Sequence, residues 1–301
     1  MGAGHGHAST HPHPGARHRW RLAVACGLVT SFFLVEVVVG WLSQSLALLS
    51  DAGHMAADVV ALASALVATR IATRADKTGR RTFGSYRAEV FASALTVLLM
   101  LGAAAYVAIE ALRRLGDSPA VAAAPMVLVG ALGLVVNVIA LLLLRGGAAE
   151  SLNVRGAYLE VVADTVGSIG VIVAGVLVSR TGDGWWDTVV ALAIAVFVAV
   201  RALMLGREVL VVLGQHAPAG LSPAEIEASL FAVPGVDDVH DLHVWTLTSG
   251  MHVATAHLMA AEGRGGEVLE TARVVLRDEY GVEHATLQVE SPSSACDQTT
   301  W

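Results

Sequence analysis

Long apolar runs dominate the chain as far as Gly214 and predict six membrane-spanning helices. Each run has about 20 residues or more, which is the length that an α-helix needs to cross a hydrocarbon core about 30 Å thick. Few polar residues interrupt them. The pattern predicts an α-helical membrane domain over residues 20–214, with helices at residues 21–42, 46–69, 88–112, 124–144, 156–178 and 187–210.

After Gly214 the pattern becomes that of a small soluble domain. Ser222, Pro223 and Glu225 have the order of an N-cap, a first helical residue and a capping-box acid, and predict a helix up to about Ala232. Strands and a second helix follow, separated by turn residues. The order α-β-β-α-β predicts an α+β domain over residues 215–291, with strands at 236–247, 251–259 and 285–290 and a helix at 267–280.

Two terminal segments have no such pattern. Residues 1–19 are rich in Gly, Pro and His, a composition that predicts disorder. Their histidines could collect metal ions weakly, or the segment could be only a polar tail or a cloning artefact; they are His5, His7, His11, His13 and His18. Residues 292–301 are expected to form a frayed tail.

Composition and charge define the class of protein and its orientation. The chain is 55% hydrophobic and 15% charged, with a mean hydropathy of +0.63, which excludes an ordinary soluble domain. Its net charge of −7 argues against a nucleic-acid partner. Arg and Lys concentrate before the first run and in the segments after the second and fourth runs, and Arg201 and Arg207 lie at the end of the sixth run. The positive-inside rule therefore predicts a multi-pass protein with both termini in the cytoplasm.

Two pairs of ionisable residues lie within the apolar runs. His54 and Asp58 are four residues apart, as are Glu160 and Asp164, so each pair shares one face of a helix. A charge at the centre of a membrane helix costs roughly 2.5 to 3.5 kcal/mol on insertion scales. Such residues are functional by default, although polar residues can also hold helices together.

The four side chains have the chemistry of a metal site. One imidazole nitrogen with carboxylate oxygens suits tetrahedral Zn²⁺, and also Mn²⁺, Fe²⁺ or Co²⁺. With His neutral the set carries −3, and a divalent ion leaves −1. Without metal, repulsion among the carboxylates favours proton uptake, so metal and protons compete for one site. That competition is the chemical basis of an antiporter.

Several motifs resemble those of the cation diffusion facilitator family of metal/proton antiporters, in the same order and spacing. They are SLALLSDAGHMAAD at 45–58, RTFGSYRAE at 81–89, NVRGAY at 153–158, VHDLHVW at 239–245, His257, and TLQVE at 286–290. The resemblance covers roughly residues 20–290. It implies a six-helix membrane domain, a metallochaperone-like cytoplasmic domain, a homodimer in the cell membrane, and export of Zn²⁺ or a similar ion against protons. It implies no enzyme activity and no permanently bound cofactor.

The resemblance also implies two metal sites. The transport site maps onto His54, Asp58, Glu160 and Asp164, and a cytoplasmic regulatory site onto His240, His257 and Glu290, with Glu283 as a further candidate. Zinc-transporting members commonly have His where this chain has Glu160, so Co²⁺, Cd²⁺, Mn²⁺ or Fe²⁺ remain alternatives to Zn²⁺. His243 has the opposite strand parity from His240, so we expect it to pack rather than to bind metal.

Two other classes of function remain open. An intramembrane metalloenzyme would need an open metal position and a separate base, and no His-Glu-x-x-His motif is present. A metal sensor would signal through the cytoplasmic domain without transport. The six predicted spans and the intramembrane ligand set favour the transporter over both.

Overall fold

The structure is a computed structural model of the 301-residue chain, and it describes residues 19–71, 83, 87–114, 120–148, 152–248 and 250–291. The predicted tails lie outside these ranges, apart from Arg19, which begins the first described helix. The chain forms two compact units, Met1–Val67 with Leu95–Met204, and Ala68–Ala94 with Leu205–Trp301.

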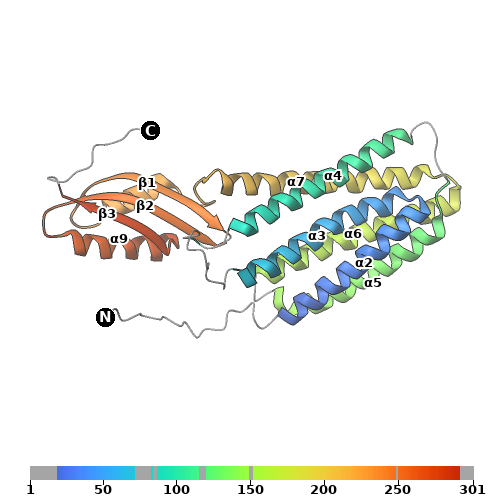
Figure 1. The fold of residues 1–301 in the computed structure, drawn as a ribbon, viewed down its shortest axis with the longest axis horizontal. Coiled ribbons are helices and arrows are strands. Elements are labelled where there is room, and N and C mark those ends of the chain that lie inside the picture. Colours follow the sequence, from blue (N-terminus) through green and yellow to red (C-terminus); the bar gives the residue numbers. More distant parts are fainter. Residues whose placement is uncertain are drawn as a thin grey trace. The chain divides into compact units, whose positions relative to one another are not determined.

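Six helices follow the six predicted apolar runs (Figure 1). They are α2 (Arg19–Ser43), α3 (Leu46–Ile71), α4 (Arg87–Arg113), α5 (Ala123–Ala148), α6 (Leu152–Thr181) and α7 (Trp185–Leu213). Within the described residues, four spans are long and apolar enough to cross a membrane: Val90–Arg113, Ala123–Gly146, Val161–Thr181 and Trp185–Leu213. Gly27–Ser43 is a shorter apolar stretch.

Small residues let the helices of the first unit pack closely. Helix α5 packs along α6 and against α2. A Cβ atom at Gly133 on α5 would come within 2.6 Å of the Phe32 ring, and one at Gly175 on α6 within 2.7 Å of Val127. Glycine at these crossings allows the close approach that is common between membrane helices.

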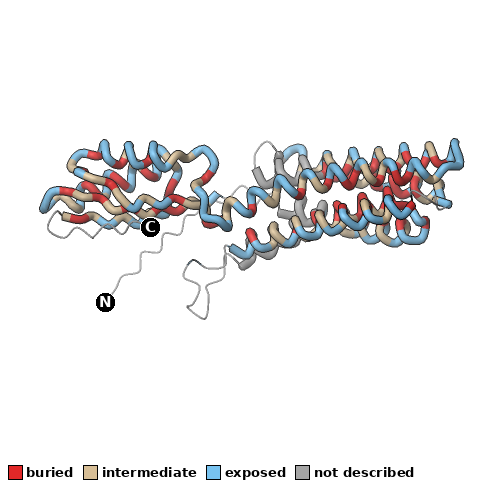
Figure 2. Tube along the Cα trace, turned by 90° about the horizontal axis from the view of Figure 1, so that it is seen from above, coloured by how far each residue is buried: buried red, intermediate tan, exposed pale blue. Residues whose placement is uncertain are grey.

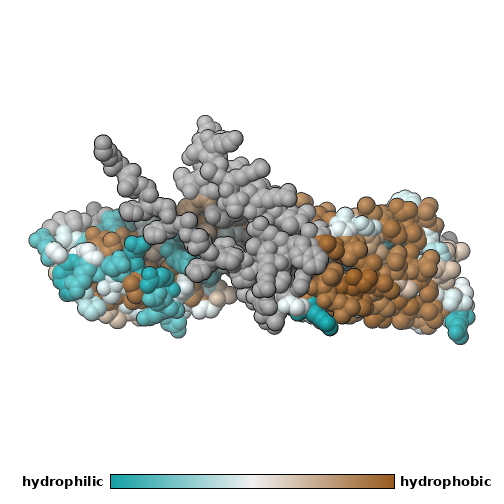
Figure 3. Space-filling model, turned by 90° about the horizontal axis from the view of Figure 1, so that it is seen from below, coloured by the Kyte–Doolittle hydropathy of each residue, from teal (hydrophilic) through white to brown (hydrophobic). Residues whose placement is uncertain are grey.

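The outer surface of the helices is apolar. Buried positions face other helices, while large side chains such as Leu98, Leu128 and Leu203 are 64–72% exposed (Figure 2). Figure 3 shows a broad hydrophobic area over the helical part of the chain. An exposed apolar surface of this kind suits contact with lipid rather than with water.

A buried carboxylate at the start of α7 holds the start of α3. Asp187 accepts hydrogen bonds from the Ser45 hydroxyl (2.7 Å) and from the backbone N–H groups of Leu46 (2.7 Å) and Ala47 (3.1 Å). It therefore acts as an N-cap supplied by another helix. Arg114, after the end of α4, lies 3.6 Å from Asp187 and donates to the Gln44 carbonyl at 2.9 Å. The contacts fix the end of the helix that carries His54.

The second unit contains the predicted α+β domain. Its elements are α8 (Pro223–Phe231), β1 (Val236–Thr248), β2 (Met251–Ala260), α9 (Gly265–Tyr280) and β3 (His284–Glu290) (Figure 1). The sheet has the order β1-β2-β3, with β1 and β2 antiparallel and β2 and β3 parallel. Ser222 caps α8 as predicted, since its hydroxyl accepts from Glu225 N–H.

The two faces of this sheet differ. Alternate residues such as Val244 and Leu258 pack with Ile226 of α8 and with Val268 and Leu276 of α9 in one core. Because side chains alternate along a strand, the residues between them point to the other face. The histidines of the predicted regulatory site lie on that second face.

A bulge in β1 changes the expected position of His243. Asp241 has a φ of 51°, and β1 uses three steps from His240 to His243 where β2 uses two from His257 to Thr255. The bulge therefore places His240 and His243 on the same face. The prediction that His243 packs on the opposite face is wrong, and its side chain is exposed.

Candidate metal sites

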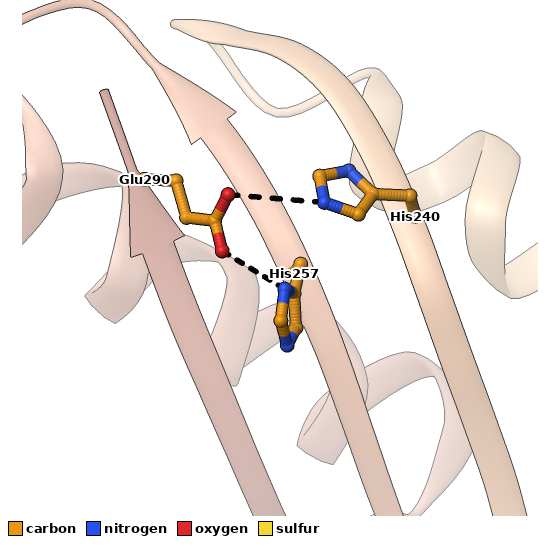
Figure 4. A group of neighbouring side chains, drawn as sticks. All are labelled: His240, His257 and Glu290. Carbon is orange, nitrogen blue, oxygen red and sulfur yellow. Dashed lines mark ion pairs between the residues drawn. The ribbon is translucent and has the colours of Figure 1, made fainter. Parts of the chain in front are cut away.

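Three side chains from three strands meet on the second face of the sheet (Figure 4). His240 lies on β1, His257 opposite it on β2, and Glu290 at the end of β3. One ligand atom from each lies within 4.8 Å of the others. The Glu290 carboxylate is 2.9 Å from His257 Nδ1 and 3.8 Å from His240 Nε2. Two imidazoles and a carboxylate at these distances can bind one divalent metal ion.

Polar neighbours orient these ligands. Asp238 Oδ2 lies 3.1 Å from His240 Nδ1, which leaves Nε2 directed towards Glu290. Gln288 donates to Glu290 Oε1 at 2.8 Å. Carboxylates that hold the second nitrogen of a ligating His are typical of metal sites. Sequence reasoning missed Asp238, although its spacing of two residues from His240 on a strand could have indicated a shared face.

The structure does not bring Glu283 into this cluster. Glu283 precedes β3, whereas Glu290 is the last residue of that strand, so the two lie about 23 Å apart along an extended chain. Glu283 and His284 are both exposed. His252 lies at the other end of β2 from His257, with Nδ1 3.4 Å from the Thr246 hydroxyl. None of these three belongs to the described cluster.

A second His–carboxylate contact lies inside the helical unit. His54 Nε2 on α3 is 3.3 Å from Asp164 Oδ1 on α6, and the two side chains are only 3% and 4% exposed. The side chains of Asp58 and Glu160 lie outside the described part of the chain. Their backbones belong to α3 and α6, one helical turn from His54 and Asp164 respectively.

A positive side chain also contacts His54. Arg201 on α7 has one guanidinium nitrogen 3.2 Å from His54 Nε2. The guanidinium carbon lies 5.9 Å from the centre of the Phe197 ring, and His54 meets the same ring edge-on at 6.4 Å. From the sequence alone, Arg201 is interpreted only as a basic residue that marks the cytoplasmic end of the sixth apolar run. No local sequence pattern links it to His54.

Further acidic residues surround this contact. Glu36 on α2 and Asp51 on α3 are 0% and 2% exposed, and their carboxyl groups interact with each other and with Asp164. Neither Glu36 oxygen has a hydrogen-bond donor among the described residues. Asp51 packs so closely on Gly167 of α6 that a Cβ there would collide with it. Four helices thus contribute polar groups to one buried region.

Family models cover nearly the whole chain. Residues 22–213 match the cation efflux transmembrane domain, and residues 218–292 match the cation efflux protein cytoplasmic domain. The chain belongs to the cation efflux family. It is therefore a multi-pass membrane transporter for metal cations and not an enzyme, as predicted, with a helical membrane domain followed by a cytoplasmic α+β domain.

Individual relatives agree with this assignment. The chain is 42% identical to the metal cation efflux system protein CzcD of Cupriavidus metallidurans, over 99% of this chain and 92% of that protein. It is 34% identical to the zinc transporter ZitB of Escherichia coli, over 96% and 93%. The solved metal-bound C-terminal domain of the CzcD transporter is 38% identical and covers 23% of this chain and 99% of its own, with a TM-score of 0.22.

Proposed function

We propose that this family member exports Zn²⁺, and related divalent cations, from the cytoplasm across the cell membrane in exchange for protons. The observation that carries the proposal is the buried contact between His54 of α3 and Asp164 of α6. An imidazole and a carboxylate from two helices, each with a second candidate ligand one turn away, form a site that both metal ions and protons can occupy. The CzcD and ZitB relatives support Zn²⁺ as a substrate.

In this mechanism the metal ion enters from the cytoplasm and binds His54, Asp58, Glu160 and Asp164. Neutral His54 supplies the nitrogen ligand, and the carboxylates lose their protons as the metal binds. Movement of the helices then exposes the site to the other side of the membrane. Protons from outside return to the carboxylates and release the metal. A relative from Bacillus subtilis, 30% identical, is named a cadmium, cobalt and zinc/H⁺-K⁺ antiporter.

The cytoplasmic cluster has a different role in the proposal. His240, His257 and Glu290 bind a divalent ion that is not transported. A metal ion there would tie three strands together on the sheet face away from α8 and α9. We propose that this binding stabilises a homodimer through the cytoplasmic domain and raises the transport rate when cytoplasmic metal is abundant. Both termini are cytoplasmic in this arrangement.

Uptake into everted membrane vesicles tests the transport proposal. Wild-type vesicles should accumulate Zn²⁺ when their interior is acidic, with Co²⁺, Cd²⁺, Mn²⁺ and Fe²⁺ as comparison ions. Asp58→Ala should abolish uptake, and exposed Glu208→Gln on α7 is the control that should transport normally. Uptake by Asp58→Ala at the wild-type rate would refute the proposed site.

The same vesicles test the role of Glu160 in selectivity. A carboxylate is a harder ligand than imidazole, so Glu160→His should shift preference towards Zn²⁺ and away from Mn²⁺. The measurement is the ratio of initial uptake rates for the two ions. An unchanged ratio would show that Glu160 does not determine selectivity.

A further inference from the structure

One positive charge lies against the intramembrane ligands. Arg201 is about 24 Å along α7 from its start at Trp185, well inside the span that ends at Leu213. Its guanidinium contacts His54 Nε2 at 3.2 Å instead of extending to the membrane surface. Ionisable residues at such a depth are expensive, and their partner indicates their role. Here the partner is a candidate ligand of the transported metal.

The contact uses the atom that a metal ion would use. Arg has only hydrogen-bond donors and keeps its charge, so a hydrogen bond in this contact requires the tautomer in which His54 Nε2 is the acceptor. Its lone pair therefore points to the guanidinium. A metal ion binds a neutral imidazole through a ring-nitrogen lone pair of the same kind. Asp164 Oδ1, 3.3 Å from the same Nε2, places a carboxylate beside this position. Arg201 and the metal thus compete for one atom.

The charge of Arg201 also matters for the bound metal. With His54 neutral, the four candidate ligands sum to −3, and Arg201 reduces the sum to −2, which a divalent ion cancels. Glu36 and Asp51 also face the cluster. Whatever protons these two carry, removal of Arg201 makes the surroundings of the site more negative by one unit. In a buried site such a change alters cation affinity strongly.

We propose that Arg201 is a tethered counter-ion of the transport site. It occupies His54 Nε2 when no metal is bound, leaves that atom when a divalent cation binds, and so limits how tightly the site holds its cargo. A site that releases its ion at each cycle must bind strongly enough to load and weakly enough to unload. The inference rests on the proposed transport function and adds a residue that determines affinity and release.

The variant Arg201→Gln tests the inference, because the inference predicts different effects on KM and on the maximal rate of transport. Zn²⁺ uptake by everted vesicles should show a KM lowered about tenfold or more, because a competitor and a positive charge are removed. The maximal rate should fall, because release becomes slow. A purely structural role would lower the rate without lowering KM. A KM that stays unchanged or rises overturns the inference.

Two further variants complete the test. Arg207→Gln removes an exposed positive charge from the same helix and should leave both constants unchanged. Arg201→Lys keeps the charge, so its KM should stay within about threefold of wild type. If the KM of Arg201→Lys falls as far as the KM expected for Arg201→Gln, the positive charge of Arg201 does not set the affinity of the site. This variant tests the inference even if Arg201→Gln fails to accumulate in the membrane.

The proposed transport function and the inferred role of Arg201 can be refuted separately. If the wild-type protein transports no divalent cation in these vesicles, the proposed function is wrong. If wild type transports Zn²⁺ and Arg201→Gln has the same kinetic constants, only the role of Arg201 is wrong.

Discussion

The two His–carboxylate clusters use the same chemical groups on different backbones. In the cytoplasmic cluster, His240 and His257 are direct partners in the ladder between β1 and β2, and Glu290 follows from β3. The hydrogen bonds of the sheet fix the distances among these side chains. In the membrane cluster, His54 and Asp164 lie on separate helices, and only side-chain packing sets their separation.

This difference explains why one cluster suits storage or sensing of metal and the other suits transport. A sheet cannot slide one strand past its neighbour without breaking ladder hydrogen bonds. Helices can shift by an ångström or two while each keeps its own hydrogen bonds. The solvent exposure of the histidines also separates the two clusters. The side chains of His240 and His257 are 15% and 25% exposed, whereas that of His54 is 3% exposed. In the proposed mechanism the sheet site would therefore exchange metal directly with the cytoplasm, whereas the helix site would need a conformational change.

The largest expected effect comes from Asp164→Asn. The variant keeps the shape of the side chain but loses the charge that binds metal. Even residues that only support a metal ligand change affinity or activity about 10- to 100-fold, so transport should fall at least about 100-fold. Metal binding by the cytoplasmic cluster should persist in this variant. The number of metal ions bound per chain at equilibrium measures it. Substantial Zn²⁺ transport by Asp164→Asn would contradict the assignment of the two clusters.

The second-largest expected effect is on the stability of the protein, at the start of the helix that carries His54. Asp187→Ala removes the acceptor of three buried donors at the start of α3 and should reduce stability by about 3 to 5 kcal/mol. Thermal unfolding of the full chain in detergent measures the loss. Asp183→Asn is the matched control, because Asp183 is exposed and accepts only from Trp185 N–H at the start of α7 among the described contacts. It should change stability by about 1 kcal/mol or less.

A smaller effect is expected at the sheet site. His257→Ala should abolish metal binding by the cytoplasmic cluster and lower the transport rate about fivefold, which is the low end of typical coupling between sites. His284→Ala changes an exposed histidine of β3 outside the cluster and should leave both unchanged. Loss of all transport in His257→Ala would show that the cytoplasmic cluster is part of the pathway.

The smallest effect should come from Asp238→Asn. Asp238 orients His240 without belonging to the cluster, so the affinity of the cytoplasmic cluster should fall about tenfold. The transport rate at saturating metal should change less than in His257→Ala. Equilibrium metal binding and vesicle uptake, measured on the same preparation, separate the two effects. An unchanged affinity would mean that Asp238 does not orient the ligand.

Local patterns in the sequence predict the elements well and the contacts between them only partly. Among the described residues, apolar runs and turn residues identify the six long helices α2 to α7, the shorter helices α8 and α9, and the three strands, because burial and capping leave local signals. The contact between Arg201 and His54, and the capping of α3 by Asp187, depend on how distant helices pack. The bulge at Asp241 shifts His243 to the face of His240, which no alternation rule could predict.

The central claim is coupled exchange of metal and protons at the His54–Asp164 site. Proteoliposomes containing a zinc dye and a pH dye measure it directly when the wild-type protein is compared with Asp164→Asn. The account predicts that zinc entry is matched by proton exit, that reversal of the pH gradient reverses zinc movement, and that both fluxes vanish together in the variant. Zinc flux that ignores the pH gradient, or that survives in Asp164→Asn, would contradict it.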